Sequence, residues 1–240
     1  MSTVGGGVNI VTNGIVLYLD ASNTKSYVSG STTWNDLSGN ENNGTLTNGP
    51  TYETANGGGL IFDGVNDYAQ RLNDTTFNSV NEFTFNFWIK YASGVDLTSL
   101  LGKPRAGWAD ALRIYYQAST TTLGYNLAGT TRCSNTSVTL STTEFTNICF
   151  VQNPSEASNP DKTKFYINGQ VLSNDSGGYA ITSVDAPTFP LIIGGWRQGN
   201  SGSPSSTWKG NINITQMYNR ALSANEVLHN YNALKSRFGL

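Results

Sequence analysis

From Gly14 onward the chain alternates short apolar runs with clusters of Gly, Asn, Ser and Thr. The clearest run covers residues 83–91, where a large apolar side chain occupies every second position. Successive side chains of a β-strand point to opposite faces, so this run predicts a strand with one apolar face turned into a core between two sheets. That face consists of Phe83, Phe85, Phe87, Ile89 and Tyr91. The opposite face is polar except for Trp88, which is expected either under a loop or on the floor of an exposed groove.

Shorter runs of similar character predict further strands. They cover residues 14–20, 59–63, 112–117, 146–152, 164–167, 190–194 and 211–218. Asn168 and Gly169 separate two apolar runs, and both residue types accept the positive φ of a two-residue hairpin turn. Short strands divided by turn residues indicate an all-β, two-sheet antiparallel sandwich. Neither a linker nor a repeat is visible within residues 14–240, so a single domain is expected there.

The two ends of the chain depart from this pattern. Residues 1–13 are rich in glycine and polar side chains with nothing to bury, which predicts a flexible arm or a short anchor onto an assembly. Near the other end, Ser223 and Glu226 have the spacing of a helix capping box. An apolar stripe follows at intervals of three and four residues: Val227, Tyr231, Leu234 and Phe238. A short C-terminal helix should therefore lie against the outside of the sandwich, with His229 off the stripe and solvated or locally hydrogen-bonded.

The chain carries little charge, with 12% charged residues and a formal net charge of −2. Because this charge offers no positively charged surface to bind phosphate groups, nucleic acid is not expected as a partner. No apolar run approaches the ~20 residues that span a bilayer, and residues 1–10 lack the features of a signal peptide. We therefore expect no membrane insertion, no secretion signal and folding in a cytoplasm. Cys133 and Cys149 form no disulfide framework; two free thiols are expected, with a bridge between them as the alternative.

The residues that hydrolases use are not found in a suitable pattern. Retaining glycosidases place two carboxylates about 5 Å apart, and no strand here carries Glu-x-Asp or Glu-x-x-Glu. The chain has one histidine, no Gly-x-Ser-x-Gly motif, and no His or Cys residues at the spacing of metal ligands. The sequence therefore predicts a protein without enzymatic activity that requires no cofactor. Asp63 and Asp67 lie in a glycine-containing turn, where they could ligate Ca²⁺ or could simply form the turn.

Five segments in a fixed order carry a family resemblance. They are Trp34–Asn40 (WNDLSGN), Phe62–Tyr68 (FDGVNDY), Phe83–Lys90 (FTFNFWIK), Phe165–Gln170 (FYINGQ) and Trp208–Ile212 (WKGNI), the last continuing into Tyr218–Ser223 (YNRALS). Together they resemble the laminin-G-like branch of the concanavalin A-like jelly rolls, over residues 14–238. The resemblance implies a jelly-roll sandwich for residues 14–240, with Trp34 and Trp208 at positions where a large side chain packs a loop or a strand end. It leaves function open, because lectins, pentraxins, glycanases and structural modules share this fold.

The resemblance also suggests where a ligand would bind. Pentraxins chelate calcium through two loops, of which the first corresponds to Asp110-Ala111 and the second to residues 194–206, which contain no Asp or Glu. The paired calcium site therefore looks absent, and Ca²⁺ is kept only as an optional ligand. Cys149 matches a pentraxin half-cystine whose partner position is Asn86 here. What these loops offer instead are stacking and hydrogen-bonding groups: Trp108, Asp110, Trp196, Arg197, Gln198 and Asn200. We expect them to form a sugar-binding site, the alternative being that each indole anchors its own loop.

A looser resemblance concerns the biological setting. WNDLSGN near the start and Tyr231–Leu240 (YNALKSRFGL) at the end look like stand-alone laminin-G-like proteins of tailed bacteriophages. This predicts a non-enzymatic virion surface protein of capsid, neck or tail, assembled in the host cytoplasm, that contacts host-surface carbohydrate. The alternatives are a purely structural decoration or fibre subunit, bound to other virion proteins through residues 1–13 and homo-oligomeric in the particle, and a glycanase.

Overall fold

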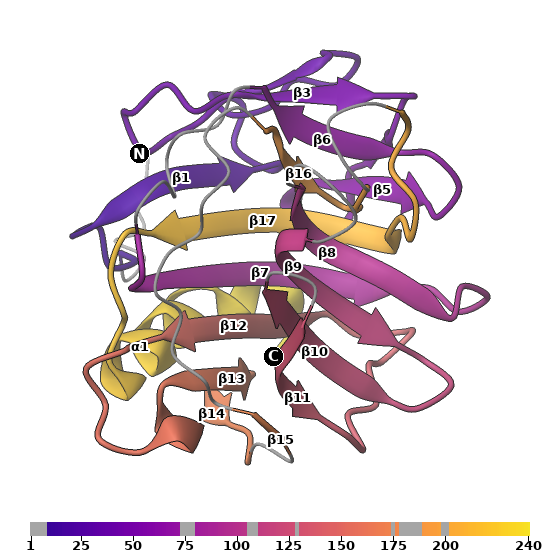
Figure 1. The fold of residues 1–240 in the computed structure, drawn as a ribbon. Coiled ribbons are helices and arrows are strands. Elements are labelled where there is room, and N and C mark those ends of the chain that lie inside the picture. Colours follow the sequence, from indigo (N-terminus) through magenta and orange to yellow (C-terminus); the bar gives the residue numbers. More distant parts are fainter. Residues whose placement is uncertain are drawn as a thin grey trace.

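The computed structural model describes residues 9–72, 80–104, 110–127, 130–173, 176–177, 189–197 and 202–240. Within them, two antiparallel sheets pack face to face (Figure 1). The eight-stranded sheet A contains β14 (Gln170–Val171), β13 (Thr163–Ile167), β12 (Thr146–Gln152), β7 (Phe83–Tyr91), β17 (Lys209–Tyr218), β5 (Gly59–Asp63), β4 (Thr51–Glu53) and β1 (Ile15–Asp20). The nine-stranded sheet B contains β15 (Ser176–Gly177), β11 (Thr130–Asn135), β10 (Thr122–Leu127), β9 (Asp110–Gln117), β8 (Leu97–Pro104), β16 (Leu191–Ile193), β6 (Tyr68–Arg71), β3 (Gly44–Thr47) and β2 (Thr33–Trp34). The helices are α1 (Ala224–Leu234) and the short 3₁₀ turns η1 (Ala55–Gly57), η2 (Asn159–Asp161) and η3 (Lys235–Phe238).

This architecture confirms the predicted two-sheet antiparallel sandwich with a short C-terminal helix. Strand β17 organises sheet A, because it pairs with β7 along one side and with β5 and then β1 along the other. The change of partner coincides with a β-bulge at Asn213, whose backbone carbonyl accepts from the Ala21 N–H. Asn168 and Gly169 adopt φ of 50° and 77°, which confirms the hairpin turn between β13 and β14.

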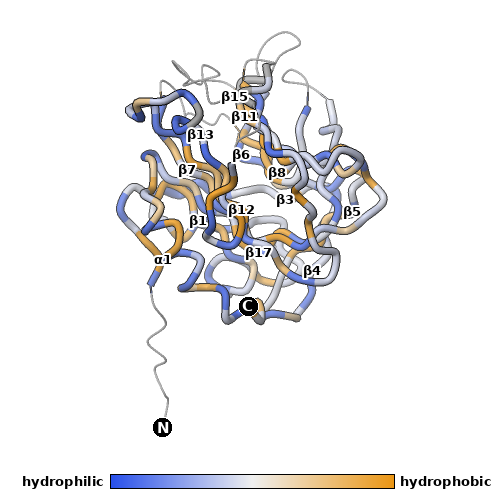
Figure 2. The backbone as a smooth tube through the Cα atoms, turned by 90° about the horizontal axis from the view of Figure 1, so that it is seen from below, coloured by the Kyte–Doolittle hydropathy of each residue, from blue (hydrophilic) through white to orange (hydrophobic). Residues whose placement is uncertain are grey.

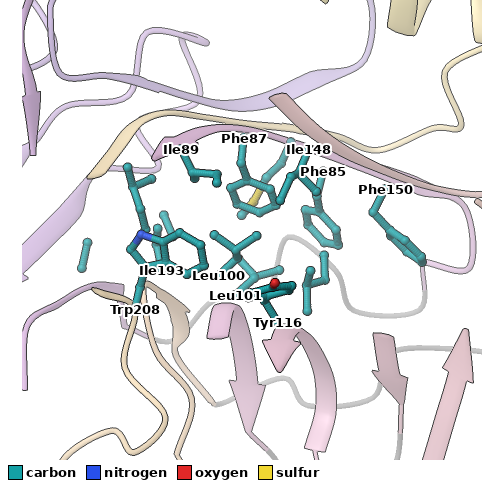
Figure 3. Packing of buried hydrophobic residues seen from close by; sticks show 14 of the residues in the cluster. Phe85, Phe87, Ile89, Leu100, Leu101, Tyr116, Ile148, Phe150, Ile193 and Trp208 are labelled. Carbon is teal, nitrogen blue, oxygen red and sulfur yellow. The ribbon is translucent and has the colours of Figure 1, made fainter. Parts of the chain in front are cut away.

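The core lies between the two sheets and is built largely from aromatic rings (Figure 3). From sheet A, Phe85 and Phe87 point toward Leu101 and Tyr116 of sheet B, as the alternation along β7 predicted. Phe150 of β12 lies 4.4 Å, centroid to centroid, from the ring of Tyr125. Trp34 and Trp208, expected to have structural roles, are both fully buried and belong to this core. Burial of this many large rings supplies most of the hydrophobic stabilisation available to the fold.

The C-terminal helix covers the outer face of sheet A, and it is this helix that covers Trp88. Its indole is fully buried between two rings, that of Phe238 at 4.3 Å and that of Tyr231 at 5.7 Å, both nearly parallel to it. Figure 2 shows α1 on the β1, β12 and β17 side of the molecule, away from β8 and β11. Trp88 therefore lies neither under a loop nor on an open groove: it anchors the helix.

The first described residues also pack on this helix. The Val11 N–H donates to Asn230 Oδ1 at 2.8 Å, and the hydroxyl of Tyr218 donates to the Val11 carbonyl at 3.0 Å. His229 Nε2 lies 2.7 Å from the Asn9 carbonyl oxygen, so the lone histidine is locally hydrogen-bonded. Residues 9–13, which the composition assigned to a flexible arm, are thus fixed by contacts; residues 1–8 lie outside the described residues.

Both cysteines are buried thiols, and they lie on opposite sides of sheet A. Cys133 belongs to the core between the sheets, whereas Cys149 packs with Tyr166 and Tyr218 on the outer face. A bridge between them would have to pass through the sheet. Burial raises the pKa of the Cys149 thiol well above its usual range, which keeps it protonated and unreactive. Among the described helices, none has the length and apolar character needed to cross a membrane.

The start of α1 is fixed by charge as well as by its cap. Ser223 and Glu226 form the predicted capping box. Glu226 also forms an ion pair with Arg220, whose Nη1 lies 3.0 Å from Glu226 Oε2. The Arg220 hydrogen bond, opposed by desolvation and aided by Ser223, lowers the pKa of Glu226 to about 2. A carboxylate with a folded-state pKa below its unfolded value stabilises the fold above about pH 4.5, and this contribution disappears as pH falls toward 2.

Replacing Glu226 by glutamine tests this assignment. Gln retains the capping-box geometry but loses the ion pair, so we expect the free energy of unfolding at pH 7 to fall by about 0.5–1 kcal/mol. Between pH 4.5 and 2 the wild type should lose stability more steeply than the variant, as measured by urea unfolding at each pH. Parallel pH profiles for the two proteins would contradict the assignment. Glu144→Gln, at an exposed position off the helix, is the matched control.

Candidate binding face on sheet B

The outer face of sheet B carries a continuous row of side chains across neighbouring strands. The pairing registers place Gln70 beside Ile192, Ile192 beside Gly102, Gly102 beside Arg113, and Arg113 beside Asn126. The residues that alternate with these along each strand point into the core, because side chains of a strand alternate between faces. We call this row, together with Tyr115 and Trp196, the sheet-B face.

A loop after β16 lies directly on this row. The N–H and carbonyl of Trp196 pair with the carbonyl and N–H of Ser205, at 3.1 and 2.6 Å, which joins the two described ends of the loop. A further bond, from the Ser99 N–H to the Ser206 carbonyl, ties the second of these ends to β8. Gly102 makes the close approach possible, since a Cβ there would lie 2.8 Å from the Gly195 carbonyl oxygen. The loop is therefore seated on the sheet by backbone contacts.

The guanidinium of Arg113 connects the Trp196 loop to the sheet, because it packs against the rings of Trp196 and Tyr115. Its guanidinium carbon lies 4.7 Å from the centre of the Trp196 ring and 5.3 Å from that of the Tyr115 ring. Its Nε donates to the Ser99 hydroxyl at 2.9 Å, which fixes the plane of the guanidinium. Arg113 is only 7% exposed, so the cation–π contacts act away from bulk water, where they are strongest. The result is a rigid indole, half-buried, held at the edge of the row.

Tyr115 provides a second flat surface. Its neighbour across the β9–β10 pair is Gly124, and a Cβ built on that glycine would lie only 2.3 Å from Cζ of the tyrosine ring. The ring therefore lies across the strand where any other residue would displace it. Because the Tyr115 side chain is half-buried, part of the ring stays accessible from outside.

Three polar atoms of this face find no hydrogen-bond partner among the described residues, although each is buried. They are Gln70 Oε1, Asn126 Oδ1 and Trp196 Nε1, that is, two acceptors and one donor. A buried polar group without a partner costs about 1–3 kcal/mol, and native proteins rarely tolerate several together without a reason. The three atoms lie beneath the surface, so they do not themselves contact a ligand bound on this face.

The structure places the predicted sugar-site residues only in part. Trp196 lies on the sheet-B face, stacked on Arg113. Arg197 is buried and its Nη1 donates to the Gly202 carbonyl at 3.0 Å, so it holds the loop together. Asp110 is described through its backbone alone, at the start of β9, where it pairs with Pro104. The predicted Trp108, Gln198 and Asn200 lie outside the described residues.

The two predicted loops meet β8 at different points. Asp110 pairs with Pro104, the last residue of β8, whereas β16 ends beside Leu101 and continues toward the start of β8. Trp196 itself lies over Gly102 and stacks on Arg113, not on Asp110. Arg113 and Tyr115 also lie on the sheet-B face, but they were not predicted from the sequence as site residues. A signal was present: both alternate with apolar residues in the run 112–117, which turns them outward.

The possible calcium turn proves to be a self-contained hydrogen-bonded turn. Asp63 Oδ1 accepts from three backbone N–H groups, those of Val65, Asn66 and Asp67, and Asp67 Oδ2 accepts from the Asp63 N–H at 3.0 Å. Desolvation raises the pKa of Asp63, but the backbone donors outweigh it and lower the pKa below its usual value. These carboxylates are therefore occupied by the turn itself. Nowhere in the described part of the chain do three Asp, Glu, His or Cys side chains converge as metal ligands.

Carboxylates also gather in a groove of about 490 Å³ between β12, β13 and the start of α1. Glu226 is bound there by Arg220, and the Ser158 hydroxyl together with Lys164 lowers the pKa of Asp161. A glycosidase acid needs the opposite shift, a pKa raised toward neutrality, so neither group suits that role. Glu82 accepts from the Ala221 N–H at 2.9 Å and positions the chain before the helix. Glu82 and Glu226 thus stabilise the start of α1, and Asp161 stabilises the turn before β13.

Comparison with solved structures shows the same fold in proteins of low sequence identity. A Trypanosoma rangeli sialidase in complex with sialic acid superimposes with a TM-score of 0.68 at 17% identity, over 99% of this chain and 36% of the sialidase. This chain thus spans about a third of the sialidase's length. Domain 4 of AbnA, a GH43 extracellular arabinanase from Geobacillus stearothermophilus, solved with arabinotriose, gives 0.61 at 16% identity, over 89% of this chain and 96% of that domain. The binding domain of Paraclostridial Mosquitocidal Protein 1 gives 0.64 at 17%, over 92% and 52%. No curated protein matches significantly by sequence.

These findings correct the predicted biological role. A virion surface protein was expected from a loose resemblance in composition and chain ends, with a decoration or fibre subunit as the alternative. The similar solved structures are instead sialidases, a domain of an arabinanase and the binding domain of a mosquitocidal protein. Composition and chain ends are weak evidence for a role, because they do not define a site. The virion assignment is therefore withdrawn.

The predicted family, in contrast, is confirmed. A family model described as the concanavalin A-like lectin/glucanases superfamily, Laminin_G_3, matches residues 63–228, which include the central strands of both sheets. With that match and the two-sheet fold together, the chain belongs to the concanavalin A-like lectin/glucanases superfamily.

Proposed function

We propose that this chain is a non-catalytic carbohydrate-binding module that holds a glycan on the sheet-B face. The observation that carries the proposal is the pair of half-buried aromatic rings, Tyr115 and Trp196, that pack against the Arg113 guanidinium on one face. Sugar rings present an apolar face and a rim of hydroxyl groups. A site for them needs flat apolar surface beside a few fixed polar groups, which is the composition of this face.

Each group has a distinct part in binding. The Tyr115 ring, held flat across Gly124, is the platform against which a sugar ring would stack. The Trp196 indole, backed by Arg113, would form the wall of the site. The half-buried side chains of Gln70 and Asn126 supply amide groups on the same face.

Two further points favour binding over hydrolysis. The described side chains of the sheet-B face include no carboxylate, whereas glycosidases of the usual kind use a pair of them. The arabinanase domain solved with arabinotriose matches this chain over 96% of the domain's length, so a unit of this size and fold is known with a bound oligosaccharide. Identity of 16% does not transfer its specificity.

Binding of a glycan panel tests the proposal. Wild type would be titrated calorimetrically with arabinotriose, with xylo-, cello- and manno-oligosaccharides and with sialyllactose. Tyr115→Ala and Trp196→Ala should each weaken the best ligand about tenfold, because each removes a stacking surface worth about 1–1.5 kcal/mol. Val65→Ala, at an exposed apolar side chain on a distant turn, is the control and should bind like wild type.

Tyr115→Phe refines the result, because it keeps the ring and removes the hydroxyl. Near wild-type affinity in this variant, with loss in Tyr115→Ala, would identify stacking as the source of binding. Wild-type affinity in both alanine variants, or reducing sugar released from any of the oligosaccharides, would overturn the proposal.

A further inference from the structure

A second hollow lies at the open edge of the sandwich and shares no residue with the sheet-B face. It has a volume of about 380 Å³ and lies between the turn that follows Tyr27 and the β3–β4 connection around Gly49. Strand β2 is the last strand of sheet B and β4 the last strand of sheet A, so this is where both sheets end. Figure 2 shows β3 and β4 near one another on this side of the molecule. We call it the edge groove.

The floor of the edge groove is aromatic and apolar. The rings of Tyr27 and Tyr52 lie 5.4 Å apart, centroid to centroid, at an angle of 42°. Leu46 and Pro50, both buried, complete the floor. Tyr52 is half-buried, so its ring presents apolar surface to whatever enters.

The walls of the groove carry hydroxyl groups. Ser29, Thr32 and Thr51 are exposed there, and none of their hydroxyls is engaged in a hydrogen bond with another described residue. None of the described lining residues is charged. A charged ligand would lose its hydration here without gaining a counter-charge, whereas a neutral ligand rich in hydroxyls would exchange water for protein hydrogen bonds.

The walls are held apart by their own hydrogen bonds, so the hollow exists before any ligand arrives. The Ser31 hydroxyl donates to the Thr33 carbonyl at 3.0 Å and accepts from the Thr33 N–H at 2.9 Å. The Leu46 N–H donates to the Thr32 carbonyl, which joins the turn to β3. On the other side, Asn48 has a φ of 64° and its Nδ2 donates to the Asn66 carbonyl at 2.7 Å. A preformed site loses little free energy to ordering when a ligand binds.

We infer that the edge groove binds one neutral sugar unit, a pentose or hexose, with the sugar's apolar face on Tyr52 and its hydroxyls on Thr32 and Thr51. The volume falls in the range of small-ligand sites, about 300–1,000 Å³. An added peptide strand is the less suitable occupant, because the flanking edge strands β2 and β4 have only two and three residues. The inference stands independently of the proposed site on sheet B.

Chemical-shift titration of the full chain tests it. Glucose, galactose, mannose and arabinose would be added to ¹⁵N-labelled protein, with glucuronic acid as the charged comparator. At least one neutral sugar should shift the amides of residues 29–32 and 48–52 in a saturable manner, and glucuronic acid should bind there about tenfold more weakly or not at all. Absence of any saturable shift in these amides for all four neutral sugars would overturn the inference.

Thr51→Arg is the decisive variant, because it places a long side chain over the groove from an exposed position. It should weaken the neutral sugar about tenfold or more. Thr33→Arg, equally exposed on β2 but outside the groove, is the matched control and should stay within about twofold of wild type. Trp196→Ala should leave these shifts unchanged. Loss of the shifts in Trp196→Ala but not in Thr51→Arg would assign the sugar to the sheet-B face and overturn the edge groove alone.

Discussion

Replacing Trp88 by alanine is expected to lower the free energy of unfolding by about 3–5 kcal/mol and to release the C-terminal segment. The indole is fully buried between the rings of Phe238 and Tyr231, so its removal leaves a cavity under α1 and breaks two stacked pairs. Each aromatic pair contributes about 0.5–1.5 kcal/mol beyond the area it buries. Urea unfolding gives the global loss of stability.

Trypsin provides a local measurement of the same change. Arg237 is held by Asp20, whose Oδ2 lies 2.9 Å from Nη1, and by the Asn56 carbonyl at 3.1 Å, which protects the following peptide bond in the wild type. In Trp88→Ala, cleavage after Arg237 should become much faster under native conditions, as read by mass spectrometry. Trp88→Phe, which keeps one ring between the other two, should recover part of both effects. Wild-type cleavage rate and a loss below about 1 kcal/mol in Trp88→Ala would show that α1 is held by other contacts.

Replacing Gly102 by alanine is expected to lift the Trp196 loop from sheet B. The added methyl would lie 2.8 Å from the Gly195 carbonyl oxygen and 3.0 Å from Trp196 Cα, both backbone atoms that cannot turn away. Overpacking of this kind costs about 1–3 kcal/mol. Because the loop supplies the Trp196 ring stacked on Arg113, we expect glycan binding on the sheet-B face to be lost together with this stability. Calorimetry and urea unfolding measure the two effects.

Gly44→Ala is the matched control for this substitution. Gly44 also lies in a strand of sheet B, but a Cβ there would meet its nearest neighbours, Ala69 and Leu19, at 3.8 Å, an ordinary van der Waals distance. Alanine also reduces the conformational entropy of the unfolded chain, so the change should be neutral or stabilising by a few tenths of a kcal/mol. Equal losses in the two variants would mean that the close approach at Gly102 is not what seats the loop.

Local sequence signals predicted those elements whose cause is local. The alternation in 83–91 identified β7 because its inward face is fully apolar, and the Asn168-Gly169 pair identified a hairpin because both residues accept positive φ. The capping box at Ser223 identified the start of α1 for the same kind of reason. Strand β8 was missed, since Leu97–Pro104 mixes Thr, Ser, Gly and Lys with only a short apolar pair and contains a bulge.

The candidate site shows the limit of such signals. Tryptophan and arginine residues in a polar loop suggested contacts with a sugar. In the structure, Arg197 instead hydrogen-bonds within its own loop. The arginine that packs against the Trp196 indole is Arg113, which lies on a strand. Nothing local distinguishes these two arginines. The different roles of Arg113 and Arg197 depend on β8, because Gly102 in this strand lets the Trp196 loop pack closely enough to contact Arg113 on β9.

The sequence by itself determined the class of fold, the family, and the positions of the best strands and of the helix, because alternation, turn preference and capping depend on neighbours in the chain. Only the tertiary structure decided what covers Trp88, which arginine carries the Trp196 ring, and where polar atoms remain buried without partners. Those features depend on the register between strands far apart in sequence. Such a register is fixed when two whole sheets close over a common core, so no single segment encodes it.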